Sequence, residues 1–297
     1  MHNAESRKLS YKIANGVIMF IMILLMLITI YPLYYTICAS FSDARALLRN
    51  NDLLLKPLEP FTLDGYKAVF SNPSIVKSFG NTVFYVVVGT AISMALTIAG
   101  AFVVSRSYFL PRNVMMKGML FTMFFGGGLI PWFFVVRDLG MYNTRWAIVI
   151  PAALSTYNLI IMRTFFQGIP DSLEEAALLD GANEIQILVR IILPLSTAVI
   201  AVIAMYYGVG YWNSWYPALM FMRNRALYPL QMFLREVLIT EQETSVAKDV
   251  TAQSSEAFDR ELVKYCMVII STVPILVIYP FLQRYFVKGV MIGAIKG

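Results

Sequence analysis

Few side chains in this sequence have the types and spacing that catalysis requires. The only histidine is His2, and the two cysteines, Cys38 and Cys266, lie within or beside apolar runs, as small buried hydrophobic residues do. Three consecutive glycines at residues 126–128 lack the following Lys-Ser/Thr of a phosphate-binding loop. We therefore expect neither acid–base catalysis nor metal binding, and no ATP hydrolysis on this chain.

One polar segment between apolar runs, residues 169–182, has the pattern of a short separate helix. Pro170 interrupts what precedes it, and Ser172 with Glu175 three residues later has the spacing of a capping box, so a helix should start there. Gly181 can adopt the left-handed conformation that ends a helix. The expected helix of about two to three turns either occupies a partner's groove or lies in the membrane interface.

A second candidate group lies inside an apolar run, at residues 206–216, where tyrosine, tryptophan and asparagine are concentrated. Sugars are held by hydrogen bonds and by aromatic ring faces, so such side chains within a membrane span are candidates for a transport pathway. We expect Tyr207, Trp212 and Asn213 to face a cavity. The outer aromatic residues also suit the belt at a membrane surface.

The composition indicates that these segments belong to a membrane protein. Hydrophobic residues make up 58% of the chain and charged residues 14%, with a mean hydropathy of +0.65, whereas about a quarter of a soluble domain is charged. Uncharged stretches of about 20 residues, enough to cross about 30 Å of hydrocarbon, recur along the chain. The net charge of +6 comes from basic residues scattered near the ends of these stretches, which argues against nucleic-acid binding.

We predict an all-α, polytopic membrane protein with six transmembrane helices, forming a single domain over residues 1–297. The predicted spans are residues 17–42, 81–105, 118–136, 146–162, 195–222 and 265–283. Arg106, Arg112 and Lys117 lie close together in one short loop, and the positive-inside rule then places both chain termini in the cytoplasm. Prolines within the spans predict kinks or breaks.

The six predicted spans contain no Asp, Glu, Lys or Arg, which bears on how transport would be driven. Proton or sodium coupling generally needs ionisable groups or concentrated carbonyl ligands in mid-membrane, so the energy is expected to come from outside the membrane. An ion-coupled secondary sugar transporter is the alternative, since an unwound helix with bare carbonyls can bind sodium. A membrane scaffold without a transport role would have no need of the short polar helix.

Several motifs resemble one protein family. Glu175-Ala176-Ala177, followed by Gly181 and then by Leu193-Pro194, looks like the EAA loop of binding-protein-dependent ABC importer permeases. Four further stretches resemble the carbohydrate-uptake permeases of the maltose-importer type: residues 125–131, 159–166, 211–215 and 286–293. Within that type, the chain is most similar to the branch that serves lipo-oligosaccharide, aldouronate and alginate importers.

The resemblance implies a subunit that forms half of an oligosaccharide pathway in a bacterial cytoplasmic membrane. The implied partners are a second homologous permease, a dimer of ABC ATPase subunits, an extracellular or periplasmic solute-binding protein, membrane lipid and the oligosaccharide. ATP and Mg would be bound by the ATPase, and this chain would carry no cofactor.

The coupling loop, residues 164–194, would place its EAA helix in a cleft of the ATPase. The implied docking residues are Glu174, Glu175, Ala176, Ala177, Asp180 and Gly181. The two glutamates also suit the positive end of the helix dipole.

Two other segments resemble parts of these permeases that contact partner proteins. The tail at residues 289–297 is similar to tails that extend between the ATPases. The loop at residues 223–264 corresponds in position to the loop that enters the binding protein in maltose-type permeases, but its polar stretch, residues 241–258, also suits a solvated linker.

Overall fold

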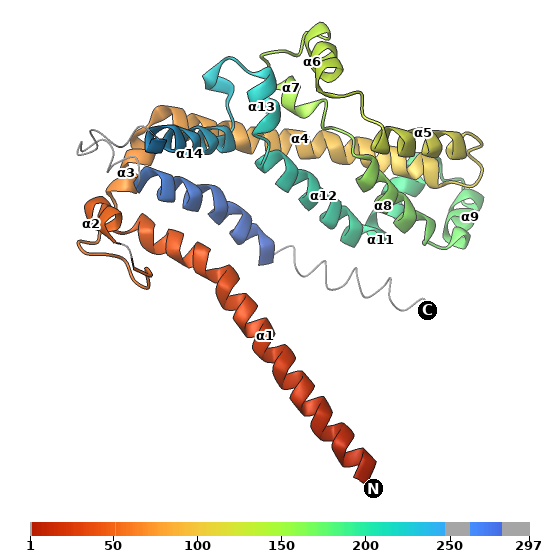
Figure 1. Cartoon of the computed structure of the whole chain (residues 1–297). Coiled ribbons are helices and arrows are strands. Elements are labelled where there is room, and N and C mark those ends of the chain that lie inside the picture. The colour runs from red at the N-terminus through yellow and green to blue at the C-terminus, as the bar shows by residue number, and fades with distance from the viewer. Residues whose placement is uncertain (1, 51, 247–261, 281–297) are drawn as a thin grey trace. The chain divides into compact units, whose positions relative to one another are not determined.

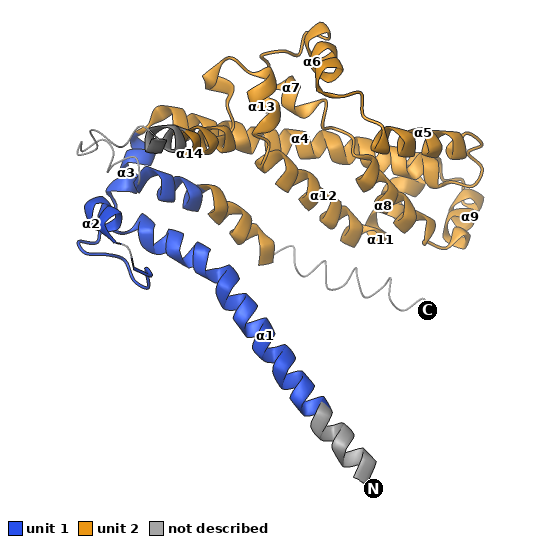
Figure 2. Cartoon of the chain, viewed as in Figure 1, with its two compact units in different colours: residues 1–71, 240–270 blue, residues 72–239, 271–297 orange. Residues whose placement is uncertain are grey.

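The computed structural model describes residues 2–50, 52–246 and 262–280, which are helical with no strand among them (Figure 1). The all-α prediction is therefore confirmed. The chain divides into two compact units, one of residues 1–71 and 240–270, the other of residues 72–239 and 271–297 (Figure 2). Residues 247–261 of the predicted loop at residues 223–264, and the predicted tail at residues 289–297, lie outside the described residues.

The first unit begins with the long helix α1 (His2–Ser40). Its apolar part, Tyr11–Ser40, is long enough to cross a membrane, and none of its most apolar stretch is buried within the chain. Such a surface needs a cover of lipid or of another apolar helix. Two short helices, α2 (Ala44–Arg49) and α3 (Asp64–Ser71), follow it.

A small core at the end of α1 holds the rest of the first unit together. Cys38 and Ala39 pack there with Leu47 and Leu54. Cys266 is also buried, and its thiol lies 3.6 Å from the carbonyl oxygen of Ser40. Both cysteines are free, as their apolar surroundings in the sequence predicted.

The second unit is built on α4 (Pro73–Ser105), which packs against α8 (Thr156–Gln167) and α12 (Thr197–Trp212). Asn72 caps the start of α4, with proline in the first helical position. Gly89 lets α12 approach closely, because a Cβ atom there would lie 2.6 Å from the ring of Tyr211. Small residues at such contacts are typical of packed membrane helices.

Polar residues near the start of α4 hold the segment that follows α13 (Tyr216–Phe221). The Asn81 amide donates to the carbonyls of Ala226 and Tyr228, and the Tyr85 hydroxyl donates to that of Leu227. This segment contains the short helix η2 (Arg225–Leu227) and leads into α14 (Leu230–Val246). The chain is thus helical across part of the predicted loop at residues 223–264.

Three of the predicted spans are broken, in keeping with the kinks or breaks that the prolines within the spans predicted. α5 (Arg112–Phe124) and α6 (Leu129–Asp138) meet at 115° across the glycines, where Gly128 has φ of +83°. α7 (Trp146–Val149) is separated from α8 by a segment containing Pro151. The third break follows α12, where Pro217 opens α13 after a short non-helical stretch.

The segment before α12 is a succession of short helical pieces that bend into it by 86°. The pieces are α10 (Glu184–Ile187), the π-helical η1 (Leu188–Ile192) and α11 (Leu193–Leu195). Pro194 lies in this region and cannot donate a backbone hydrogen bond. The bend separates these short pieces from the continuous helix α12.

Within the described residues, three helices are long and apolar enough to cross a membrane, and five spans result if each bent pair counts as one. The three are Tyr11–Ser40, Pro73–Ser105 and Leu262–Pro280. A sixth span requires α7 and α8 to cross together, and the count of six stays a prediction. The last residues of the predicted sixth span, 281–283, lie outside the described residues.

Candidate coupling helix and pathway pocket

The predicted short helix exists as α9 (Asp171–Leu179), nine residues long. It begins two residues earlier than the capping box predicted, because Pro170 and not Ser172 occupies the N-cap position, and Ser172 therefore lies inside the first turn. The expected capping box between Ser172 and Glu175 does not form, and that detail was wrong. The carboxylates of Asp171 and Glu174 in the first turn instead suit the positive end of the helix dipole.

Helix α9 ends at the position that Gly181 predicted. Gly181 has φ of +80°, and its N–H donates to the carbonyl of Leu178 at 3.0 Å. The N–H of Ala182 donates to the carbonyl of Ala177 at 2.9 Å, which completes a Schellman motif. A capping box does occur just beyond, where Asn183 and Gln186 exchange hydrogen bonds at the start of α10.

One face of α9 is attached to the end of α4 by a buried ion pair. Arg106, the C-cap residue of α4, donates to the carboxylate of Glu174, and both residues are under a tenth exposed. The Arg106 guanidinium also lies 4.7 Å from the ring centroid of Phe102, and its Nε donates to the Ser105 hydroxyl. Figure 1 shows α9 beside the ends of α4 and α5.

Other polar contacts reinforce this attachment. The Tyr108 hydroxyl donates to Glu184 Oε2 at 2.7 Å, and burial together with this carboxylate raises the pKa of Tyr108, which keeps the donor protonated. Arg163 of α8 donates to the carbonyl of Val104 at 3.0 Å. The start of α10 and the side of α8 are therefore joined to the same end of α4.

The opposite face of α9 is exposed, and the predicted docking residues divide between the two faces. Glu175, Ala176, Asp180 and Gly181 are exposed and Ala177 is half-buried, whereas Glu174 points into the chain. Leu179, at 90% exposed, is the most prominent apolar side chain of the helix. The docking role of these residues stays a prediction, and Glu174 is the one whose carboxylate is occupied within this chain.

The three predicted pathway residues have different surroundings. Tyr207 is buried, accepts the N–H of Ser155 at 3.0 Å and bonds the Thr97 hydroxyl at 2.7 Å. Trp212 is buried as well, and its indole N–H donates to the Ser271 carbonyl at 2.9 Å. Asn213 is exposed at the end of α12 and accepts a hydrogen bond from Gln231.

A pocket of 510 Å³ lies between α8 and α12, and Tyr207 is the only one of the three predicted pathway residues among those that line it. Its other lining residues include Ser155, Tyr157, Asn158 and Tyr206. Sequence reasoning missed the two neighbours Tyr157 and Asn158. They are an aromatic and a polar residue inside a predicted span, so the criterion that selected Tyr207 would have found them.

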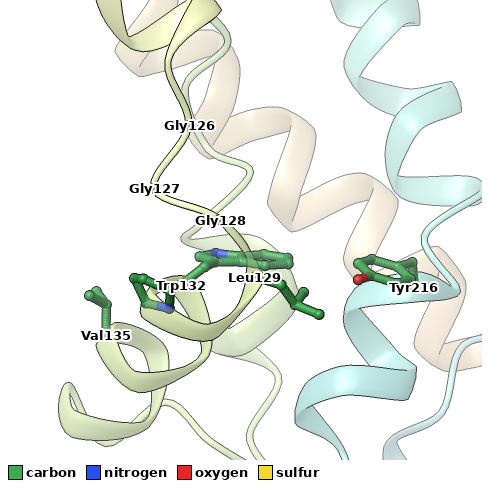
Figure 3. A pocket seen from close by; sticks show the side chains of 8 residues that line it. Gly126, Gly127, Gly128, Leu129, Trp132, Val135 and Tyr216 are labelled. Carbon is green, nitrogen blue, oxygen red and sulfur yellow. The ribbon is translucent and has the colours of Figure 1, made fainter.

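A second pocket, of 550 Å³, opens beside the break between α5 and α6. Figure 3 shows Trp132 of α6 and Tyr216 of α13 on its two sides, with the backbone of residues 126–128 along its edge. The Trp132 ring packs edge-on against Phe221 at 4.7 Å between centroids. This pocket, like the one between α8 and α12, is lined mainly by apolar groups.

The described part of the chain contains no group of three or more His, Cys, Asp or Glu residues that would hold a metal ion. Its distinctive features are long apolar helices, spans broken at glycine and proline, and a short polar helix with an exposed face. Together they define a multi-pass membrane protein of the transport class.

The chain belongs to the family of binding-protein-dependent transport system inner membrane components, whose model matches residues 108–292. It is 42% identical over 275 residues to Protein LplC of Bacillus subtilis, a match covering 91% of this chain and 90% of LplC. It is 38% identical over 272 residues to the polygalacturonan/rhamnogalacturonan transport system permease protein YtcP of the same organism, covering 91% and 94%.

A solved structure agrees with these sequence relatives. The chain matches a subunit in the crystal structure of a bacterial ABC transporter involved in the import of the acidic polysaccharide alginate, with a TM-score of 0.84 and 30% identity. The match covers 93% of this chain and 98% of that subunit. The predicted family is confirmed, and the chain is a permease subunit of an ABC transport system.

Proposed function

We propose that this chain forms half of the membrane pathway of an importer for uronate-containing oligosaccharides. The similarity to YtcP, named for polygalacturonan and rhamnogalacturonan transport, and to the alginate importer subunit supports this substrate class. A solute-binding protein delivers the oligosaccharide, and a second, homologous permease completes the pathway. Both termini of this chain lie in the cytoplasm of a bacterial cell.

The observation that carries the coupling part of the proposal is the two-faced environment of α9. Its inner face is fixed to α4 through Glu174, while its outer face presents Glu175, Asp180 and the exposed Leu179. An apolar side chain flanked by carboxylates fits a groove bordered by Arg or Lys of a partner. Ala176 and Ala177 permit close approach. The partner is a dimer of ATPase subunits, which binds ATP and Mg.

Movement of α9 has a direct structural route to the pathway. The Arg106–Glu174 ion pair joins α9 to the end of α4, and α4 packs along both α8 and α12. These two helices line the 510 Å³ pocket. A rigid helix that contacts both the coupling helix and the pocket walls provides the element through which ATP-driven closure changes access to the pathway.

The proposal is tested with the complete transporter reconstituted in vesicles. ATP enclosed on the ATPase side is expected to drive uptake of radiolabelled trigalacturonate, and the sugar-loaded binding protein is expected to stimulate ATP hydrolysis. An imposed sodium or proton gradient without ATP serves as the control. Uptake that follows the ion gradient and ignores ATP would overturn the proposed coupling.

A further inference from the structure

We propose that the pocket between α8 and α12 is a sugar subsite, which binds one pyranose ring through its neutral hydroxyl groups, with Asn158 as the central contact. The inference rests on the proposed function and deepens it.

The first observation is an unused side-chain amide that is open to the pocket. Asn158 is only 6% exposed, it lines the pocket, and its side chain takes part in no hydrogen bond with any other described residue. Its backbone N–H donates to the Ser155 hydroxyl. No amide atom of Asn158 is both fully buried and unpaired, so the amide is open to the pocket, where an entering group can bond it in place of water. Sugar hydroxyls donate and accept at once, as the amide does.

The second observation is the pair of aromatic rings beside this amide. Tyr157 of α8 is 56% exposed and Tyr206 of α12 is 40% exposed, so each presents much of its ring to a space outside the chain's own packing. Their positions on two helices border the pocket. Ring faces of this kind suit the C–H face of a pyranose, while the phenolic hydroxyls remain able to bond its oxygens.

The third observation is the fixed floor of the pocket. The Tyr207 hydroxyl is held between Thr97 and Ser155. The neighbouring Tyr211 hydroxyl donates to the Val149 carbonyl at 3.0 Å and bonds Ser93. These side chains are already satisfied, so they shape the pocket without reorganisation, and the amide of Asn158 remains as the group that selects a ligand.

The charge of the pocket identifies the part of the sugar that it contacts. None of the described residues that line it is Asp, Glu, Lys or Arg. A uronate carboxylate would find no counter-charge here and would lose its hydration. The subsite therefore binds the hydroxyl-bearing, uncharged part of a sugar residue. Its volume of 510 Å³ lies within the range of small-ligand sites.

The test compares uptake with ATP hydrolysis in the complete reconstituted transporter, using trigalacturonate as the probe. Asn158→Ala and Tyr206→Ala are each expected to lower uptake at subsaturating sugar at least fivefold, with binding-protein-stimulated ATP hydrolysis retained. Tyr206→Phe keeps the ring and is expected to transport at close to the wild-type rate. Val209→Ala, on the same helix but outside the pocket lining, is the matched control.

A labelling experiment separates ligand contact from a purely structural role. Asn158→Cys is expected to react with a hydrophilic methanethiosulfonate reagent, and trigalacturonate presented by its binding protein is expected to slow that reaction. The inference is overturned if sugar leaves the labelling rate unchanged, if both alanine variants transport normally, or if they lower the melting temperature and ATP hydrolysis along with uptake. Failure of the wild-type transporter to import trigalacturonate would instead overturn the proposed function.

Discussion

The two candidate regions of the second unit hold their polar groups in opposite ways. At α9 a buried arginine and a buried glutamate are paired with each other, and the exposed face carries the groups that are free to meet a partner. In the pocket between α8 and α12 the hydroxyls of Tyr207 and Tyr211 are satisfied, and the uncharged amide of Asn158 is left over. The difference matches the two proposed roles, docking and force transmission at α9 and sugar binding in the pocket.

The largest expected effect comes from breaking the ion pair. Arg106→Ala leaves the Glu174 carboxylate buried without its partner, which is expected to destabilise the second unit by about 3–5 kcal/mol. The melting temperature of the purified complex measures this. Arg106→Met combined with Glu174→Met removes both charges and is expected to recover most of the loss. Equal stability of the single variant and the wild type would contradict a structural ion pair.

The next effect tests the end of α9. Gly181→Ala is expected to cost about 1–2 kcal/mol, because φ there is +80° while the added methyl group meets no atom within 4 Å. Stimulated ATP hydrolysis is expected to fall as the helix end shifts. Gly126→Ala is the matched control, since its methyl group also meets nothing within 4 Å but its φ is not in the left-handed region. Similar losses in both variants would remove the argument from backbone conformation.

The exposed face of α9 gives a third prediction. Leu179→Asp is expected to reduce binding-protein-stimulated ATP hydrolysis about tenfold, equivalent to about 1.4 kcal/mol of lost contact with the ATPase, without a change in melting temperature. Leu110→Asp alters a leucine that is equally 90% exposed but lies outside α9. If the two substitutions cause the same loss, the docking face does not belong to α9.

The smallest expected effect concerns the hydrogen bond between Tyr108, in the loop after α4, and Glu184 of α10. Tyr108→Phe removes the hydrogen bond to Glu184 and is expected to cost about 0.5–1 kcal/mol, since the pair is partly open to solvent. A decrease of a few degrees or less in melting temperature is the measurement. A loss as large as that of Arg106→Ala would mean that this bond, and not the buried ion pair, holds α9 in place.

Local signals in the sequence account for what could be predicted of α9. Pro170 and Gly181 act on their own backbone, so the existence and the end of the helix could be predicted from the sequence. The expected capping box failed because the helix begins two residues early. The pairing of Glu174 with Arg106 could not be predicted from the sequence. The two residues are 68 positions apart, and only the packing of the helices brings them together.

The pathway pocket shows a similar limit. Tyr207 was predicted from its residue type within a span, and it lines the pocket. Trp212 has the same type of signal but is buried with its indole bonded to Ser271, because rotation around a helix decides which side chains face a cavity. An evenly apolar helix such as α12 carries no periodic pattern that would reveal that rotation.

The burial of the Arg106–Glu174 ion pair also has a consequence for ionic strength. Dissolved salt screens charges that are open to water far more than charges enclosed by protein. Rising salt concentration should therefore weaken the attraction of Glu175 and Asp180 for a basic groove, while α9 keeps its position on α4. In concentrated salt, the permease is expected to dissociate from its ATPase while the Arg106–Glu174 ion pair stays formed. The two proteins are then expected to reassociate when the salt is diluted.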